Sequence, residues 1–441
     1  VEFNPSTNVT EHLFPVFQPK GTMDEWRAAM EFYNQPHMEL HQFVIGLAFG
    51  SIFTQFTAVN SAILHLFSPE SGLGKTTSLL AASSIWGNPA RVVLKESDTF
   101  NSKMLRAEVY KNLLLPMDEV TNASPKELSD FAYQHASGEQ RNRMAMSGNQ
   151  ERVRGSTWKQ MVVSTGNASI IEKIMAYKTV PKGEMMRILE VRVAKVPGLS
   201  KADTDALSLR LLNNYGHAGI PFVQYILQDI EGVKRLYRTV QEKVDLEMGL
   251  TYQERFYSVL ITNALTGLIV AKKAGLVNFP TADIMAWAKT AVHQALAQAE
   301  SVTPDPEQLL MLFWAENYNN VLRIKSTQDM RGTAETAEND QFIVADGTPR
   351  GALVMRYEYD LKHLYIVPTA LRDWCVKKQI SYTGLMDGLR NGRARGKFVR
   401  KRMGKGTRTN MPPVQTLLIE CDWLDETLVA HLQTPTADTE A

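Results

Sequence analysis

The feature that most constrains the fold is a short apolar run that leads directly into a loop of small residues. Residues 62–67 read Ala-Ile-Leu-His-Leu-Phe, and residues 68–77 read Ser-Pro-Glu-Ser-Gly-Leu-Gly-Lys-Thr-Thr. An apolar run of this length is typical of a central parallel strand, and the residues from Thr76 onward predict a helix. A strand, a small-residue loop and a helix in this order are the context that a phosphate-binding loop needs.

Further short apolar runs indicate more strands. They lie at 91–94, 112–117, 160–164 and 188–193, separated by polar and helical segments. Strands that alternate with helices predict an α/β sheet. The stretch 40–69 contains no Asp, Glu, Lys or Arg. Because polar residues interrupt it and Gly50 and Ser51 break its middle, it predicts a buried helix and a buried strand rather than a membrane span.

The 441 residues predict two or three domains, at about 150 residues per domain. We expect a helical entry over 1–60, an α/β core over 61–197, a helical domain over 198–325, a linker over 326–346 and a basic domain over 347–441. In the helical domain, long amphipathic segments lie at 203–214, 222–243, 252–274 and 282–300.

The last domain is expected to combine hairpins and helices. Its hairpin arms are predicted at 352–358 with 362–367, and near 397–401 with 414–420, and its helices at 369–378 and 382–391. Helices followed by a basic hairpin favour a small winged-helix-like domain.

The loop after the first strand carries the residues that are expected to bind phosphate. Lys75 is expected to reach the β and γ phosphates of ATP, and the Thr76 hydroxyl to bind Mg²⁺. Backbone N–H groups of the loop wrap the phosphates, and the residues expected to bind the nucleotide are Ser71, Gly72, Gly74, Lys75, Thr76 and Thr77. Pro69 stands where the usual pattern has its first glycine. Because Gly-Lys-Thr also occurs by chance, the assignment needs a second motif.

That second motif is a hydrophobic run that ends in two acids. Leu-Leu-Leu-Pro-Met at 113–117 is followed by Asp118 and Glu119. Asp118 is expected to bind Mg²⁺, directly or through water, and Glu119 to polarise the attacking water as general base. The alternative is a strand whose end meets solvent at two acids.

Two further residues are candidates for catalysis. Asn167 follows the run 160–164 and is expected to touch the γ-phosphate or the lytic water; its alternative role is a helix cap for the residues after it. Arg187 precedes the last strand, where a subunit can present it to a neighbour's γ-phosphate as an arginine finger, or where it is plain surface charge. Arg192, within that strand, is the weaker candidate for the finger.

Positive charge is concentrated in two segments, although the 48 Lys and Arg nearly balance the 47 Asp and Glu. A basic segment over 139–154 is predicted to form a hairpin inserted in the α/β core, and a C-terminal run with interleaved glycines carries no acid. The residues expected to contact nucleic acid are Arg141, Arg143, Arg152, Arg154, Arg393, Arg395, Lys397, Arg400, Lys401 and Arg402. Their alternatives are solvated surface, a subunit interface or an acidic protein partner.

These motifs resemble a known family. Residues 24–193 are similar to the phage and prophage ATPases catalogued as domain of unknown function nine-two-seven. The similarity lies in Gly-Lys-Thr-Thr-Ser-Leu-Leu-Ala-Ala-Ser-Ser-Ile-Trp-Gly-Asn-Pro at 74–89, in the strand before Asp118, and in Ser-Thr-Gly at 164–166. It continues more loosely into Tyr-Gly-His-Ala-Gly at 215–219 and Glu-Arg-Phe at 254–256.

The resemblance implies an AAA+ type P-loop ATPase core of the superfamily three helicases. Such proteins form hexameric rings with ATP sites between subunits and hairpins that line a DNA channel, and they are often joined to a primase or primase-polymerase. Because no initiator Met precedes Val1, we expect the motor part of a longer primase-helicase that translocates on single-stranded DNA. The alternatives are a duplex-binding initiator or packaging ATPase that does not unwind DNA, and an ATP-gated scaffold.

The cysteines and the N-terminal sequence indicate the cellular compartment. Cys375 and Cys421 are too few for a disulfide framework or a four-cysteine zinc site, so free thiols in a reducing cytoplasm are expected. For a phage-encoded protein, that compartment is the cytoplasm of the bacterial host. Neither a signal peptide nor a membrane partner is expected, and Mg²⁺ is the one metal predicted.

Overall fold

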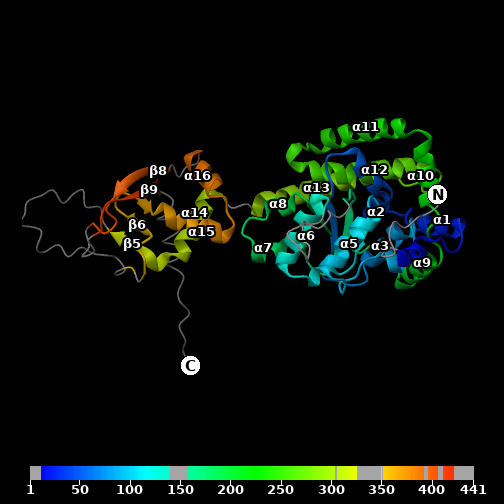
Figure 1. Cartoon of the computed structure of the whole chain (residues 1–441), viewed down its shortest axis with the longest axis horizontal. Coiled ribbons are helices and arrows are strands. Elements are labelled where there is room, and N and C mark those ends of the chain that lie inside the picture. The colour runs from blue at the N-terminus through cyan, green and yellow to red at the C-terminus, as the bar shows by residue number, and fades with distance from the viewer. Residues whose placement is uncertain are drawn as a thin grey trace, which may run out of the picture. The chain divides into compact units, whose positions relative to one another are not determined.

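The computed structural model describes residues 11–139, 157–302, 305–324, 349, 351–391, 396–405 and 411–421. The chain divides into two compact units (Figure 1). The first comprises residues 1–177 and 181–301, and the second comprises residues 178–180 and 302–441. Each unit has its own sheet and its own hydrophobic core.

The described part of the first unit contains a parallel sheet of four strands in the order β2-β3-β1-β4. The strands are β1 (Ile63–Phe67), β2 (Leu115–Met117), β3 (Val162–Gly166) and β4 (Ile188–Arg192). All four coincide with predicted strands. Since β1 is central and its neighbours run parallel to it, the loops after β1, β2 and β3 emerge at the same edge of the sheet.

The fifth predicted strand of this unit, at 91–94, is wrong. Helix α4 (Pro89–Val92) occupies most of it, and Leu94 makes a single parallel bridge with Met117. The Asn88 side chain accepts a hydrogen bond from the Ala90 N–H at 3.1 Å, and Pro89 stands in the first turn. An N-cap followed by proline starts a helix and overrides the β preference of the valines.

Helices cover both faces of this sheet. They include α1 (Met23–Glu31), α2 (Glu39–Gly50), α3 (Lys75–Ser84), α5 (Phe100–Tyr110), α6 (Pro125–Ser137), α7 (Ile170–Tyr177), α8 (Lys182–Met185), α9 (Lys201–Asn213), α10 (Gly219–Gln228), α11 (Ile230–Met248), α12 (Arg255–Lys273) and α13 (Thr281–Val302). The predicted helix 222–243 is two helices, α10 and α11, because Asp229 interrupts it. The Asp229 carboxylate caps α11 by accepting from the Gly232 N–H at 2.8 Å.

The uncharged stretch from residue 40 is a buried helix followed by a buried strand, as predicted. Every residue of α2 from Leu40 to Gly50 is buried, and α2 packs closely along α12. A Cβ on Gly50 would lie 1.8 Å from the Asn263 carbonyl oxygen, so the close approach of the two helices requires glycine there. Among the described residues, no helix is both long and apolar enough to cross a membrane.

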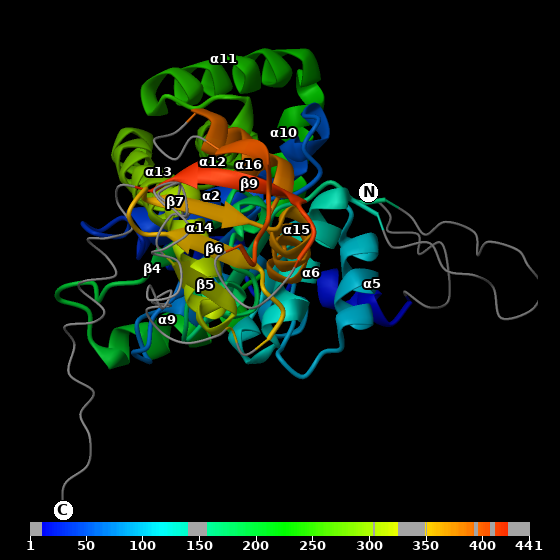
Figure 2. The ribbon, with the colours of Figure 1, turned by 90° about the vertical axis from the view of Figure 1, so that its left-hand side faces the viewer.

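The second unit contains a sheet in the order β5-β6-β7-β9-β8. Its strands are β5 (Val321–Ile324), β6 (Met355–Glu358), β7 (His363–Ile366), β8 (Gly396–Lys401) and β9 (Val414–Glu420). The antiparallel pairs β6–β7 and β8–β9 confirm the two predicted hairpins. Figure 2 shows this sheet with β7 in its middle, between β6 and β9.

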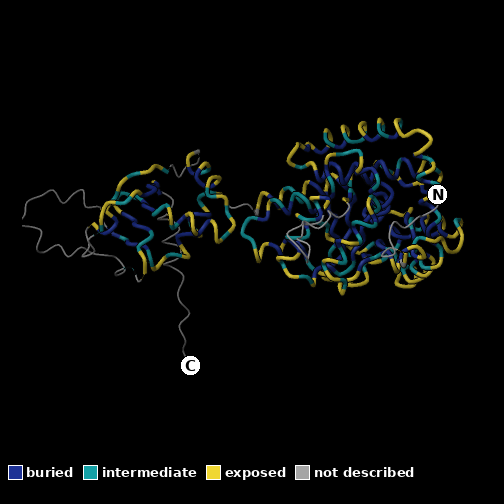
Figure 3. The backbone as a smooth tube through the Cα atoms, viewed as in Figure 1, coloured by how far each residue is buried: buried dark blue, intermediate teal, exposed yellow. Residues whose placement is uncertain are grey.

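Three helices cover one face of the second sheet: α14 (Pro306–Glu316), α15 (Pro368–Lys378) and α16 (Tyr382–Asn391) (Figure 1). Cys375 and Cys421 are both buried there, and they form no disulfide with each other. Figure 3 shows buried residues in the interior of both units, whereas α11 has a largely exposed side and the edge strand β8 has no buried residue. The predicted linker 326–346 lies outside the described residues.

Candidate nucleotide-binding site

The loop between β1 and α3 has the backbone geometry of a phosphate cradle. Gly72 and Gly74 have φ angles of +76° and +85°, in the left-handed region that favours glycine. Gly74 is the N-cap of α3 and contributes no side chain to it, so the first N–H groups of that helix stay free for an anion. The loop therefore forms with Pro69 in place of the usual first glycine.

Lys75, the first residue of α3, is held beneath this loop. Its Nζ donates to the carbonyl oxygens of Ser68 at 2.8 Å and Glu70 at 3.1 Å, and to Oδ1 of Asn167 at 3.3 Å. All three acceptors are neutral, and the side chain is 7% exposed. Burial lowers the pKa of Lys75, opposed by the charges of Glu119 and Asp118. The cation is thus positioned without being neutralised by a direct ion pair.

The two acids follow β2 at the same edge of the sheet. The Thr76 hydroxyl donates to both carboxylate oxygens of Asp118, at 3.3 and 3.4 Å. Glu119 has a left-handed backbone, with φ +55°, and its carboxylate accepts from Nδ2 of Asn167 at 3.0 Å. Asn167 therefore bridges Lys75 and Glu119, and the structure brings the predicted lysine, threonine, acids and amide into one network.

Thr165 belongs to this network, although the sequence reasoning did not select it. Its hydroxyl donates to Asp118 and accepts from the Glu119 N–H at 3.3 Å. One side chain on β3 thus fixes both acids that follow β2. The available signal was its place in Ser-Thr-Gly-Asn at the end of β3, one strand away from the acids.

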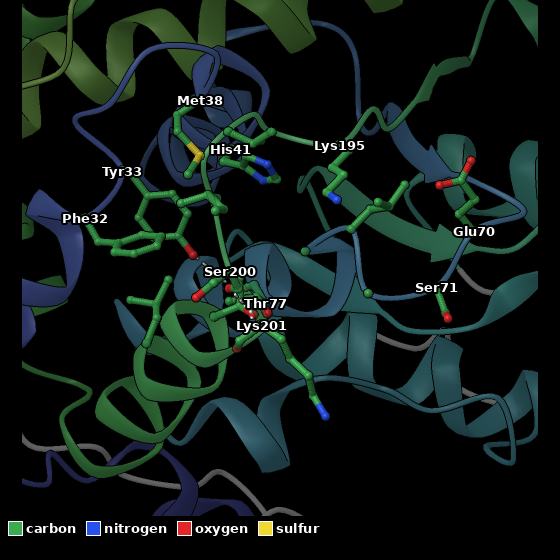
Figure 4. Close-up of a pocket in the computed structure, with 17 residues that line it drawn as sticks. Phe32, Tyr33, Met38, His41, Glu70, Ser71, Thr77, Lys195, Ser200 and Lys201 are labelled. Carbon is green, nitrogen blue, oxygen red and sulfur yellow. Dashed lines mark hydrogen bonds between the residues drawn. The ribbon is translucent and has the colours of Figure 1, made fainter.

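The network opens into two adjoining hollows. The first, of 450 Å³, is lined by the loop, Glu119 and Asn167 on one side and by the start of α9, including Lys201 and Asp205, on the other. The second, of 310 Å³, shares the loop and Lys201 and extends to residues from α1 to α2. Its walls, drawn in Figure 4, include Phe32, Tyr33, Met38, His41 and Lys195.

These two hollows differ in what they can hold. The first is lined by the N–H groups of the loop, by Lys75 and Lys201 and by Glu119 and Asp205, which suits phosphates and a hard cation. The second carries aromatic and apolar side chains on one wall, which suits a planar base. The sequence reasoning missed both Lys201 and the residues between α1 and α2, because they are brought here only by the tertiary fold.

Arg187 is not part of this network. Its carbonyl oxygen accepts from the Ile63 N–H at the start of β1, so Arg187 lies at the opposite edge of the sheet from Lys75. Its guanidinium donates to the Gly183 carbonyl at 2.6 Å and lies 4.4 Å from the Tyr133 ring centroid and 5.0 Å from that of Phe256. Burial lowers the pKa of Arg187.

Arg192 is placed differently from Arg187. It ends β4 opposite Phe67 of β1, at the edge that carries the loop, and it is exposed. Within one subunit, Arg192 rather than Arg187 lies at the edge of the sheet that carries the nucleotide loop.

The candidate nucleic-acid residues are only partly described. Arg141, Arg143, Arg152, Arg154, Arg393 and Arg395 lie outside the described residues. On the edge strand β8, Lys397 and Arg400 are exposed, as is Phe398 with 45% of its surface, and Arg402 is exposed just after the strand. Lys401 instead turns inward and lies 2.7 Å from Glu358.

Within the described part of the chain, no cluster of three or more His, Cys, Asp or Glu residues is arranged to hold a metal. The oxygen atoms of Thr76 and Asp118, together with a bound phosphate, remain a suitable set of hard ligands for Mg²⁺, which keeps several waters and needs few protein ligands.

Comparisons with known proteins agree with this architecture. A family model described as "Domain of unknown function (DUF927)" matches residues 4–155. No curated protein matches the sequence. A solved structure titled "SCCmec type IV Cch - active helicase" is similar with a TM-score of 0.58 and 15% identity, over 92% of this chain and 71% of that one. The chain therefore has a helicase-like fold, with mixed α/β structure around a parallel sheet.

Proposed function

We propose that this chain is an ATP-dependent DNA helicase of replication. The observation that carries the proposal is the convergence of Lys75, Thr76, Glu119 and Asn167 on one cleft at the carboxyl edge of the parallel sheet, with Asp118 hydrogen-bonded to Thr76. A cleft with this set of groups is suited to hydrolysing a nucleoside triphosphate.

The residues at the cleft have separable roles in this proposal. ATP lies with its phosphates on Ser71, Gly72, Gly74 and Thr77 and on the amino end of α3, and Lys75 moves from backbone carbonyls to the β and γ phosphates. Thr76 and Asp118 hold Mg²⁺, which supplies charge stabilisation when bound. Both offer oxygen ligands, the kind that Mg²⁺ requires.

Hydrolysis is assigned to the acid and the amide. Glu119 accepts the proton of the attacking water as general base. Asn167 donates to Glu119 at 3.0 Å, so it keeps that carboxylate oriented, and its Oδ1 contacts Lys75 at 3.3 Å. A γ-phosphate entering between Lys75 and Glu119 would displace these contacts, which makes Asn167 a sensor of the bound state.

The motor role rests on the fold and on charge. The solved structure with a similar fold is named an active helicase, and exposed Lys397, Arg400 and Arg402 with Phe398 suit a phosphate backbone and a stacked base. We propose a hexamer, with Arg187 reaching a neighbour's ATP and the basic segment 139–154 moving along single-stranded DNA. The protein would act in the bacterial cytoplasm as the motor part of a phage-type primase-helicase.

The first test is ATP hydrolysis with and without single-stranded DNA. We expect hydrolysis that DNA stimulates and that Lys75→Ala and Glu119→Gln each reduce by about 10²- to 10³-fold. The matched controls are Lys243→Ala and Glu247→Gln, an exposed pair on α11, which should leave the rate unchanged. Wild-type protein without hydrolysis under either condition would refute the motor.

A forked duplex then separates the helicase from the other functions. Strand separation that requires ATP and is lost in Glu119→Gln supports unwinding. ATP hydrolysis with preference for duplex and no strand separation would instead indicate an initiator or packaging ATPase. ATP-dependent assembly on DNA with no unwinding and no duplex preference would indicate a scaffold.

A further inference from the structure

The hollow beside the phosphate cleft contains a histidine whose protonation is fixed by its neighbours. His41, on α2, lines this hollow together with Phe32 and Tyr33 (Figure 4). Its Nδ1 lies 2.6 Å from the Ser78 hydroxyl on α3, directly behind the phosphate loop. The histidine therefore connects the wall of the hollow to the helix that carries Lys75.

The Ser78 hydroxyl determines which ring nitrogen carries the proton. That hydroxyl lies 2.9 Å from the Gly74 carbonyl oxygen, which accepts but never donates a hydrogen bond. Because a serine hydroxyl has one proton, both contacts form together only when Ser78 donates to Gly74 and accepts from Nδ1–H of His41. The neutral ring then has its lone pair on Nε2.

The ring stays neutral at physiological pH. Burial lowers the pKa of His41 to about 4. The charged side chains that line the hollow are of both signs, Glu70 as well as Lys195 and Lys201, so burial is the cause of the lowered pKa. Nε2 is accordingly a hydrogen-bond acceptor over the working pH range.

This acceptor has no partner in the described part of the chain. The hydrogen bond with Ser78 uses Nδ1, which leaves Nε2 without a contact to the described residues. Nε2 is also not one of the fully buried atoms without a partner, so solvent or a ligand can reach it. Nε2 therefore has no hydrogen-bond partner among these residues and is not sealed in the core, and the residue that carries it lines the hollow. A ligand that fills the hollow will be favoured if it places an N–H donor at this atom.

We propose that His41 reads the exocyclic amino group of adenine through Nε2, and so selects ATP over nucleotides with an oxygen at that position. This inference rests on the proposed function, since it assigns the base end of the same nucleotide. Phe32 and Tyr33 supply the apolar wall for the ring system, and the 310 Å³ hollow is large enough for a purine. An oxygen at the amino position faces the Nε2 lone pair and is disfavoured.

Inosine triphosphate tests the proposal because it differs from ATP in this group. Displacement of a fluorescent ribose-modified ATP by ATP or ITP, with Mg²⁺ present, gives both dissociation constants. We expect the wild-type protein to bind ATP about tenfold more tightly than ITP, the effect of one hydrogen bond.

Two substitutions separate the two ring nitrogens. In His41→Asn, the amide nitrogen replaces Nδ1 and keeps the bond to Ser78, but the group at Nε2 is lost, so ATP binding should weaken to the level of ITP. In His41→Gln, the amide reaches the Nε2 position and should retain part of the preference. His293→Phe, at an exposed histidine of α13, is the control and should leave the ratio unchanged.

The outcomes distinguish this inference from the function on which it rests. Equal binding of ATP and ITP by the wild-type protein, or an unchanged preference in His41→Asn, would refute the proposed contact between His41 and adenine. Neither result would contradict the proposed ATPase function. A protein that binds neither nucleotide would overturn both. Weakened binding of ITP as well as ATP in His41→Asn would also refute it, since the lost group contacts only the amino position.

Discussion

The two units each contain a cluster of charged side chains, but the clusters differ in how their charges are satisfied. In the first unit, Lys75 donates only to neutral oxygens and faces a cleft of 450 Å³ with Glu119. In the second unit, Arg356 and Glu358 are fully buried and lie 2.8 Å apart. The first cluster leaves space for a ligand between its charges. In the second, each charge has a counter-charge within the fold, although Nη2 of Arg356 and Oε2 of Glu358 form no hydrogen bond with the described residues.

In the second cluster, the charged side chains bind one another and the backbone, as expected for charges that stabilise the fold. Glu358 accepts from Arg356 and from Lys401, which also lies 4.1 Å from the Tyr365 ring centroid. Nη1 of Arg356 donates to the carbonyls of Met403 at 3.0 Å and Lys405 at 2.5 Å, in the turn after β8. Arg356 therefore anchors the backbone from which the basic run continues, without offering its charge to a partner.

The sharpest test of this comparison replaces Lys75 by methionine, which has similar length and no charge. We expect ATP turnover to fall about 10²- to 10³-fold. The free energy of unfolding should change little, because removal of a desolvated cation offsets the loss of its three hydrogen bonds. Turnover and a thermal melt of the same preparation measure both. A marked loss of stability would instead show that Lys75 stabilises the fold, as Arg356 does.

Arg356→Ala should have the opposite profile. Removal of one partner leaves Glu358 buried with only Lys401, and we expect the second unit to lose about 3–5 kcal/mol. ATP turnover without DNA should not change. Hydrogen exchange of the β8 and β9 amides in the full chain measures the loss. The double variant Arg356→Met, Glu358→Met should recover much of the protection, since apolar replacement of a buried pair is often neutral.

Glu190 in the first unit is a partly buried carboxyl group that is only partly satisfied by hydrogen bonds. It lies on β4 opposite His65 and accepts from the Ile171 N–H at 3.1 Å, while its Oε1 has no donor among the described residues. Burial raises the pKa of Glu190 to about 7. The folded state therefore holds a proton that the unfolded chain releases at its ordinary pKa of 4.5.

The sign of the resulting pH dependence follows. Between pH 4.5 and about 7, the folded state binds more protons than the unfolded state, so stability falls as pH rises through this window and then levels off. The total loss should be about 3 kcal/mol. In Glu190→Gln, denaturant melts from pH 5 to 8 should lack this component. An unchanged pH dependence in that variant would show that the carboxyl is solvated.

The parts of the site that sequence reasoning found are those with local signals. The loop at 68–77 and the pair Asp118 and Glu119 each directly follow an apolar run, and parallel strands bring such ends together. The same logic placed Asn167. The strand at 91–94 failed because a cap and a proline outweigh a short apolar run.

The parts that it missed depend on packing between distant segments. His41 meets Ser78 across 37 positions of sequence, and no periodicity marks that contact. Arg356 lies in an ordinary strand pattern, and its burial depends on the turn at Met403 that folds over the sheet. Thr165 stood within the recognised motif, but only the pairing of β2 with β3 reveals that it holds both acids.

Thr165 yields the prediction with the smallest expected effect. In Thr165→Val, the shape is kept but Asp118 loses a donor and the Glu119 N–H loses its acceptor. The acids remain present with less fixed orientation, so we expect ATP turnover to fall about tenfold with little change in the ATP dissociation constant, since a hydrogen bond contributes about 1 kcal/mol. Thr165→Ser should retain most activity.

The matched control is Thr266→Val on α12, since the buried Thr266 hydroxyl has no hydrogen-bond partner in the described structure and its loss should leave turnover unchanged. If both valine variants behaved alike, Thr165 would be a packing residue, and the functional cluster would end at the charged groups and Asn167.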